Sequence, residues 1–163
     1  NNYNVGLPPA DKDQANWPLI KKLLSKNEGR DIVGSSDIGF STEVFKEFIS
    51  LRMSSPLFRL TSSEEIINRV KFHNTGKEQQ IGLIVMSIDD SEPSEQLDTD
   101  ISSMVVIFNT STEAKMIYFN NAAKYQLHPT QKNGIDTIVK QSTSNENNFS
   151  VPALTTSVFI KKR

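Results

Sequence analysis

The chain's only two histidines, His73 and His128, are the first side chains to consider for chemistry, because imidazole is the commonest general base and activator of a serine nucleophile. Each histidine stands at the end of a strand-like run beside turn-forming residues, and no catalytic signature surrounds any serine. The two are also too far apart in the sequence for the H-x-x-x-H pair of a zinc site. We therefore expect each histidine to bond locally or to lie at a strand edge, and we assign neither a catalytic role.

Carboxylates are concentrated between Asp89 and Asp100, in the sequence DDSEPSEQLDTD. Oxygen-rich segments of this kind can hold calcium, but this one lacks the glycine and the terminal glutamate of an EF-hand. The segment is also too poor in apolar residues to be buried, which favours a solvated acidic loop over a calcium site. The candidate calcium ligands are Asp89, Asp90, Glu92, Asp98 and Asp100.

Glycoside hydrolysis needs two carboxyl groups held roughly 5 to 9 Å apart on a rigid scaffold. The chain offers two sets of neighbouring glutamates, Glu43 with Glu47 and Glu64 with Glu65. The first set fits the solvated surface of a helix, and the second fits the acidic first turn of a helix, where it complements the helix dipole. Neither set indicates a catalytic pair, and the glycines match no phosphate-binding loop.

Sugar binding by a β-rich domain usually needs aromatic faces open to solvent. Two of the candidates lie in irregular chain, where exposure is easier, and two lie in apolar strand runs, where packing against the sheet is the commoner outcome. One tryptophan is few for a dedicated sugar-binding surface, so we rank a sugar-binding module as an alternative. The four candidates are Tyr3, Trp17, Tyr118 and Tyr125.

Composition limits the class of protein that could position these groups. Lysine and arginine number 18 and aspartate and glutamate 19, a net charge of -1, so no charge excess attracts nucleic acid or an anionic membrane. No cysteine is present, which excludes disulfides, thiolate zinc sites and cysteine nucleophiles. No apolar run approaches the roughly 20 residues of a membrane helix, and the start, NNYNVGLPP, carries no signal-peptide pattern. We expect a globular domain junction cut from a larger protein.

Hydrophobic spacing divides the chain into a helical part and a β part. Residues 1–38 show no sustained period apart from Trp17–Leu24, so we predict mostly irregular chain there. Apolar residues recur at helical spacing from Ser41 to Met53, which predicts an amphipathic helix that ends before Pro56. We expect residues 57–60 to be extended. Ser62 and Glu65 have the spacing of a capping box, which predicts a short helix through about Asn68.

The C-terminal part contains strand-like runs separated by turns. Asn74-Thr75-Gly76 and Asn133-Gly134 are turn formers, and the polar stretch 142–148 is typical of a long hairpin tip. Seven such runs predict an antiparallel β-sandwich. The runs are Val70–Phe72, Leu83–Ile88, Met104–Phe108, Met116–Phe119, Tyr125–Leu127, Phe149–Val151 and Ser157–Ile160.

Several motifs in order along nearly the whole chain resemble the C-terminal end of pullulanase-type debranching enzymes, including plant limit dextrinase. They are NNYNVGLPP, WPLIKKLL, SSPLFRLTSSEEIINRVKFHNTG, GLIVMSIDD, VVIFN and LHPTQ. The resemblance implies that residues 1–60 are the end of a (β/α)8 barrel of the α-amylase clan, with its last helix at Ser41–Met53. Residues 61–163 would then form the C-terminal β-sandwich, so the implied fold is a mainly β α+β fragment.

The resemblance also implies a function for the parent protein, the cleavage of α-1,6 branch linkages in pullulan, starch or glycogen-derived dextrins. The family's catalytic carboxylates lie upstream of this chain, so no residue here inherits a catalytic role and the fragment alone is expected to be inactive. Only Asn1, Asn2 and Tyr3 would lie near the substrate cleft, at the C-terminal face of the barrel.

The sandwich is expected to stabilise the upstream barrel, packing on its last helix through one of two sets of side chains. These sets are Val44, Phe45, Phe48 and Ile49, or Leu57, Phe58 and Leu60. Without the barrel, the helix would expose an apolar stripe, and we expect the fragment to self-associate or to dock its helix on the sandwich. No cofactor is expected in the fragment, and the family allows calcium in the parent. An extracellular or cell-envelope location is expected for a bacterial parent, and a plastid location for a plant-like one.

Overall fold

The computed structural model describes residues 7–26, 35–92 and 95–163, in two compact units, Asn1–Phe45 and Lys46–Arg163. In the first unit α1 (Ala10–Asp13), η1 (Gln14–Asn16) and α2 (Trp17–Lys26) follow one another, and the Trp17 indole N–H donates to the Pro8 carbonyl at 2.8 Å. The two helical turns predicted from Trp17 are confirmed. The expectation of mostly irregular chain is wrong for residues 10–26, which are helical throughout.

Three helical segments precede the strands of the second unit. α3 (Ser35–Ser54) confirms the predicted helix and extends it by a turn or more at its start; it crosses the boundary between the two units. η2 (Pro56–Arg59) replaces the extended chain predicted there. The Ser55 side chain accepts from the Leu57 N–H, and Pro56 occupies the first helical position, where its fixed φ starts a turn as readily as it ends α3. α4 (Ser63–Arg69) has the predicted capping box, in which Ser62 and Glu65 each bond the other's backbone N–H.

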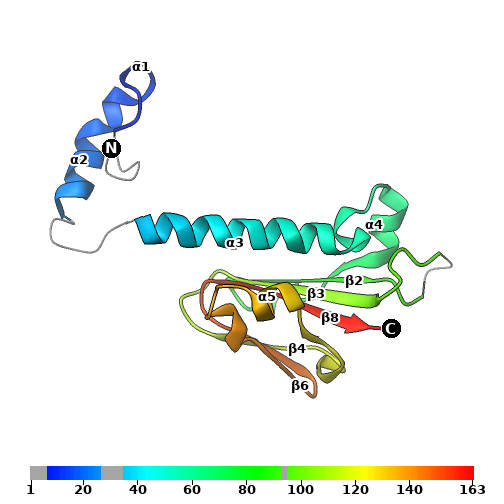
Figure 1. Cartoon of the computed structure of the whole chain (residues 1–163). Coiled ribbons are helices and arrows are strands. Elements are labelled where there is room, and N and C mark those ends of the chain that lie inside the picture. The colour runs from blue at the N-terminus through cyan, green and yellow to red at the C-terminus, as the bar shows by residue number, and fades with distance from the viewer. Residues whose placement is uncertain (1–6, 27–34, 93–94) are drawn as a thin grey trace. The chain divides into compact units, whose positions relative to one another are not determined.

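Two antiparallel sheets form the predicted sandwich (Figure 1). The larger has the order β1-β2-β3-β8-β5, made from Val70–Phe72, Leu83–Asp89, Ile101–Asn109, Thr155–Lys162 and Gln126–Leu127. The smaller has the order β4-β7-β6, made from Lys115–Tyr118, Asn148–Val151 and Thr143–Asn145. All seven predicted runs contain a strand. The predicted hairpin tip at 142–148 is an additional strand, β6, paired with β7 across a tight turn at Glu146 and Asn147.

Short elements connect these strands. They are η3 (Ala122–Lys124), α5 (Pro129–Asn133) and η4 (Val139–Gln141).

The large sheet carries a buried cluster on each face, which explains why its central strands contain continuous apolar runs such as Met104–Phe108 in β3 and Val158–Ile160 in β8. A bulge in β3 sets which side chains face each way, since the register with β8 shifts between Ile101 and Ser103. The Ser102 hydroxyl donates to the carbonyl of Lys161 at 3.2 Å. Because neighbouring residues of a strand point to opposite faces, the extra residue brings Ile101 to the same face as Met104.

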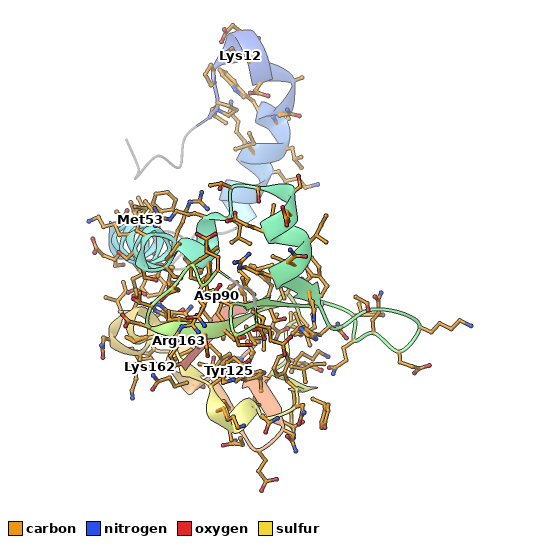
Figure 2. All side chains as sticks on the ribbon, turned by 90° about the vertical axis from the view of Figure 1, so that its right-hand side faces the viewer. Lys12, Met53, Asp90, Tyr125, Lys162 and Arg163 are labelled. Carbon is orange, nitrogen blue, oxygen red and sulfur yellow. The ribbon has the colours of Figure 1, made fainter. Side chains whose placement is uncertain are left out.

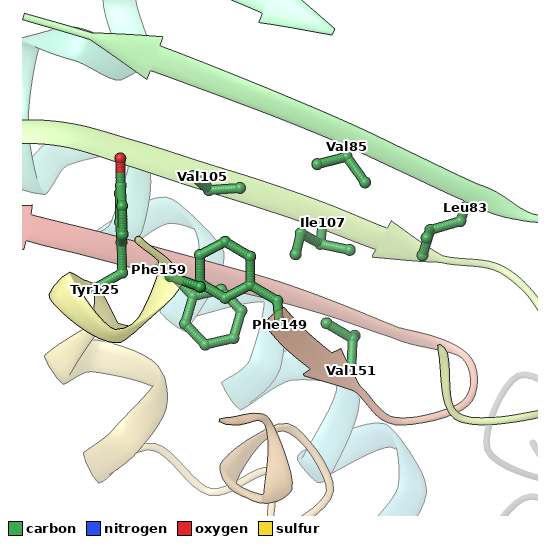
Figure 3. Close-up of a cluster of buried hydrophobic side chains, with 9 residues drawn as sticks. Leu83, Val85, Val105, Ile107, Tyr125, Phe149, Val151 and Phe159 are labelled. Carbon is green, nitrogen blue, oxygen red and sulfur yellow. The ribbon is translucent and has the colours of Figure 1, made fainter. Parts of the chain in front are cut away.

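The inner cluster of apolar side chains lies between the two sheets (Figure 3). Phe149 of the small sheet stacks on Phe159 of the large one, with ring centroids 4.4 Å apart. The Tyr125 hydroxyl donates to the Ser103 hydroxyl at 3.0 Å, which satisfies its polar end inside the core. The other buried members are Leu83, Val85, Val105, Ile107, Ala122 and Val151.

The outer cluster joins the opposite face of the large sheet to the helical layer. Leu51 of α3 and Leu57 of η2 are 3% and 1% exposed, and Phe58 and Leu60 pack against them. Of the two predicted contact sets, the set from η2 therefore makes the contact. The sheet contributes Ile88, Ile101, Met104, Val106, Val158 and Ile160.

Candidate functional site

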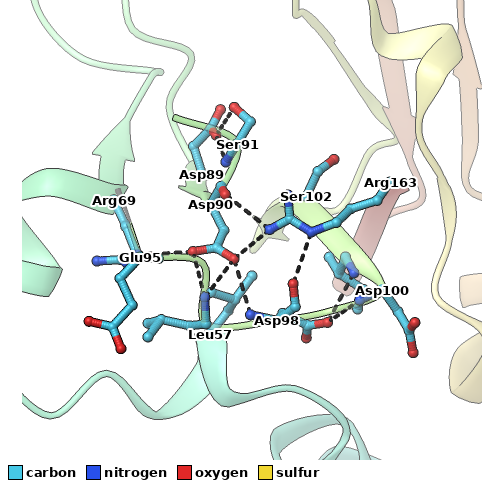
Figure 4. Close-up of polar contacts among 12 residues, drawn as sticks. Leu57, Arg69, Asp89, Asp90, Ser91, Glu95, Asp98, Asp100, Ser102 and Arg163 are labelled. Carbon is cyan, nitrogen blue, oxygen red and sulfur yellow. Dashed lines mark hydrogen bonds and ion pairs between the residues drawn. The ribbon is translucent and has the colours of Figure 1, made fainter. Parts of the chain in front are cut away.

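A buried carboxylate, Asp90, connects the helical layer, the sheet and the last residue of the chain (Figure 4). Its two oxygens pair with Arg69 Nε of α4 at 3.1 Å and with Arg163 Nη2 at 2.8 Å. They also accept from the backbone N–H groups of Leu97 at 3.0 Å and Asp98 at 3.1 Å. A buried charge is tolerated where it is paired and hydrogen-bonded, and Asp90 meets both conditions. We call Asp90, Arg69, Arg163, Asp98 and Ser55 the polar hub.

Asp98 is the second carboxylate of the polar hub. Burial raises the pKa of the Asp98 carboxyl, but hydrogen bonds from the Ser55 hydroxyl and from the backbone N–H groups of Ile101 and Asp100 outweigh it, so the pKa lies below its ordinary value. The backbone carbonyl of Asp98 also accepts from Arg163 Nε at 2.9 Å. Asp98 thereby ties the start of η2 to the loop before β3.

The structure corrects the prediction of a solvated loop between Asp89 and Asp100 for two of its acids. Asp90 and Asp98 are 0% and 8% exposed and serve as an internal counter-ion and as acceptors, whereas Glu92 and Asp100 are exposed, as predicted. Within residues 7–26, 35–92 and 95–163, no three histidine, aspartate or glutamate side chains are grouped so that they could hold a metal ion. Asp90 and Asp98 therefore have structural roles in this loop.

His128 is buried and bonded on both ring nitrogens. Its Nδ1 accepts from the Thr130 N–H at 3.2 Å, so Nε2 carries the proton and donates to the Ser54 hydroxyl at 3.1 Å. The Ser54 hydroxyl in turn donates a hydrogen bond to the Leu51 carbonyl at 2.7 Å. Burial lowers the pKa of His128, which keeps the ring neutral. In this geometry the histidine donates to the serine and has no carboxylate partner, so the pair lacks the arrangement of a nucleophile and its general base.

His73 lies just after β1, the edge strand of the large sheet, as predicted, but its side-chain contacts are with residues distant in the sequence. Its Nε2 lies 2.7 Å from the Ser87 hydroxyl, and its ring meets Phe119 edge-on with centroids 5.0 Å apart. Burial, and then the charge of Lys71, lower its pKa. These contacts give both Nε2 and the ring of His73 a structural role.

The remaining candidate residues from the sequence differ in where they lie. Tyr125 is buried in the inner cluster, whereas Tyr118 is 67% exposed on the outer side of β4. Asn1, Asn2 and Tyr3 lie outside the described residues. Glu47, predicted to be solvated, accepts from the Ile135 N–H at 2.6 Å, and Gly134 leaves the space in which its carboxylate lies.

The part of α3 in the second unit has a second apolar face. Glu47, Leu51 and Ser54 face the sandwich, as their contacts above show. Residues two positions apart lie on nearly opposite sides of a helix. Ile49 and Met53 accordingly point away from the sandwich and are 48% and 58% exposed. Met53 is labelled in Figure 2. Phe48, beside them, is 42% exposed. We call Phe48, Ile49 and Met53 the outer face of α3.

No helix in the described parts of the chain has the length and apolar character needed to cross a membrane.

The fold and these contacts define a class, a β-sandwich domain with a helical layer packed on its larger sheet and a buried polar hub between them. A family model described as alpha-1,6-glucosidases, pullulanase-type, C-terminal, matches residues 1–162. The chain belongs to this family of pullulanase-type C-terminal regions. The resemblance predicted from its motifs is confirmed.

Individual relatives agree with the family match. The chain is 43% identical over its whole length to Pullulanase 1, chloroplastic, of Arabidopsis thaliana, and 36% identical over 72% of its length to a pullulanase of Klebsiella pneumoniae. A crystal structure of the maltotriose complex of PulA from Klebsiella pneumoniae matches the entire chain with a TM-score of 0.84 and 30% identity. The chain spans 18% of the Arabidopsis protein and 18% of that crystallised chain.

Proposed function

We propose that this chain is the non-catalytic C-terminal part of a longer pullulanase-type glycoside hydrolase, which cleaves α-1,6 branch linkages in pullulan, starch or glycogen-derived dextrins. In this proposal residues 41–53 belong to the last helix of a (β/α)8 barrel. The sandwich stabilises that barrel by packing against the side of the helix that faces away from it. The chain supplies no catalytic carboxylate, and its buried acids are engaged in the polar hub.

The outer face of α3 is the observation that carries the proposal. A helix with a single apolar side packs against one neighbour. This helix has Leu51 buried on the sandwich, Ile49 and Met53 directed away from it, and the partly exposed Phe48 between the two directions. Burying side chains of this size contributes about 1.5 to 3 kcal/mol each. The relatives are more than five times as long as this chain, which supports the preceding part of the same polypeptide as the partner.

A plastid location for the longer protein is proposed on its similarity to the Arabidopsis relative, whose name describes that relative as chloroplastic. Calcium binding by the longer protein is likewise a proposal that rests on the family.

The proposal is tested with the isolated chain and with the longer protein lacking it. We expect the isolated chain to release no reducing sugar from pullulan and to migrate unchanged, relative to a non-binding control protein, through gels containing pullulan. The longer protein without this region should unfold at lower temperature. Hydrolysis by the isolated chain would contradict the proposal, and specific retardation in the gel would instead favour an α-glucan-binding module.

A further inference from the structure

His128 joins three elements of the second unit at one buried point. Its backbone N–H donates to the Val158 carbonyl of β8 at 2.8 Å, its Nδ1 caps the first turn of α5, and its Nε2 reaches Ser54 at the last residue of α3. The residue is 4% exposed. The ring therefore connects α5 and the end of α3 through two bonds that each depend on which nitrogen carries a proton.

We infer that His128 is a proton-sensitive clasp, which caps the start of α5 while its ring is neutral and loses this cap when the ring takes up a second proton. The neutral ring with its proton on Nε2 satisfies both bonds. A proton added to Nδ1 would point at the Thr130 N–H, so two donors would face each other and the cap of α5 would be lost. A charged ring at this depth would also lack a carboxylate partner.

The groups around the ring decide whether the second proton could be accommodated in place. A shallow cavity beside His128 is lined by Ser54, Asp100, Lys162 and Arg163, among others. Arg163 is held by Asp90 and by the Asp98 carbonyl, and Lys162 adds positive charge that opposes an imidazolium. Opposing this, the carbonyl end of α3 and the exposed carboxylate of Asp100 favour one.

Two further charged groups belong to the elements packed on His128. Glu47 of α3 is engaged by the Ile135 N–H, and Lys132 lies in the last turn of α5. The lost bond to Thr130 and the burial of the ring therefore oppose the binding of the second proton. Burial lowers the pKa of His128, in the direction the clasp requires.

The clasp changes stability with pH in a direction that follows from linkage. With the folded-state pKa lowered, the unfolded chain binds a proton at a higher pH than the folded chain does. Stability is therefore full above the ordinary histidine pKa of about 6.5 and falls as the pH drops from there towards the folded-state pKa. His73 contributes with the same sign, because its pKa is also lowered.

Nitrogen-15 and proton NMR of the whole 163-residue chain tests the clasp. We expect the His128 ring to show the Nε2–H form at neutral pH, and the Thr130 amide resonance to shift with the same midpoint as the ring, below the ordinary value. In His128→Asn, where asparagine can still cap α5 but cannot titrate, the Thr130 shift should disappear, whereas in the matched variant His73→Gln it should persist.

A proton on Nδ1 at neutral pH would overturn the inference, and so would a ring midpoint at or above the ordinary value or a Thr130 amide that ignores the ring. The inference does not depend on the proposed function, because the titration uses only this chain.

Discussion

At the scale of single residues, the arrangement of Asp90 shows that charge in this chain is used for structure. The carboxylate is fully buried between Arg69 and Arg163, and its removal would leave Arg69, itself 4% exposed, without a counter-ion. We predict that Asp90→Asn lowers the free energy of unfolding by about 3 to 5 kcal/mol. Urea denaturation followed by circular dichroism measures this loss.

The matched control for Asp90 is Glu113→Gln. Glu113 pairs with Lys115 at 3.8 Å, but its side chain is 81% exposed, so this variant should change stability by no more than about 0.5 kcal/mol. Equal losses from the two variants would mean that the polar hub contributes no more than a surface pair.

Asp98 gives a prediction about acid. Because its folded-state pKa lies below the ordinary value, its contribution to stability is present above that value and is lost as the pH falls through the folded-state pKa. We predict that Asp98→Asn loses less stability than the parent chain between about pH 5 and pH 3. Ser55→Ala, which removes the side-chain donor to Asp98, should flatten the same profile in part. Parallel stability curves for all three proteins would refute this reading of Asp98.

At the scale of elements, the helices and strands encoded by neighbouring residues were predicted well, and the contacts between residues distant in the sequence were not. The capping box at Ser62 and Glu65 and the β-branched runs of β2 and β3 are encoded within a few residues, and each element appeared where predicted. η2 was missed because Ser55 and Pro56, which stop α3, also start a turn. The buried role of Asp90 depends on arginines 21 and 73 positions away, which no local pattern in an acidic segment indicates.

η2 is also where the helical layer is most firmly attached to the sheet. Leu57 is 1% exposed in the outer cluster, so Leu57→Ala should cost about 2 to 5 kcal/mol of unfolding free energy. The neighbouring Arg59 is exposed and provides the comparison, since Arg59→Ala should cost far less. Thermal unfolding of the two variants measures the difference. A Leu57→Ala variant as stable as Arg59→Ala would show that η2 is not packed as described.

At the scale of the whole molecule, two kinds of contact meet on one helix, α3. The side of α3 that carries Leu51 and Ser54 is fixed within the second unit by the outer cluster and by His128. The outer face is proposed to meet the preceding part of the longer polypeptide. A sandwich that fixes a barrel helix in this way would stabilise the enzyme without touching substrate, so variants of the outer face should change the melting temperature more than they change the rate of pullulan hydrolysis.

The most direct test of the proposed role of the outer face compares two isoleucines of nearly equal exposure in the longer protein. Ile49 on the outer face of α3 is 48% exposed and Ile138, beside η4 on the sandwich, is 47% exposed. In the isolated chain Ile49→Gln and Ile138→Gln should each change stability by less than about 0.5 kcal/mol. In the longer protein we predict that Ile49→Gln alone lowers the melting temperature, through a loss of about 1.5 to 3 kcal/mol. Equal melting temperatures for the two variants there would contradict the proposed role of the outer face.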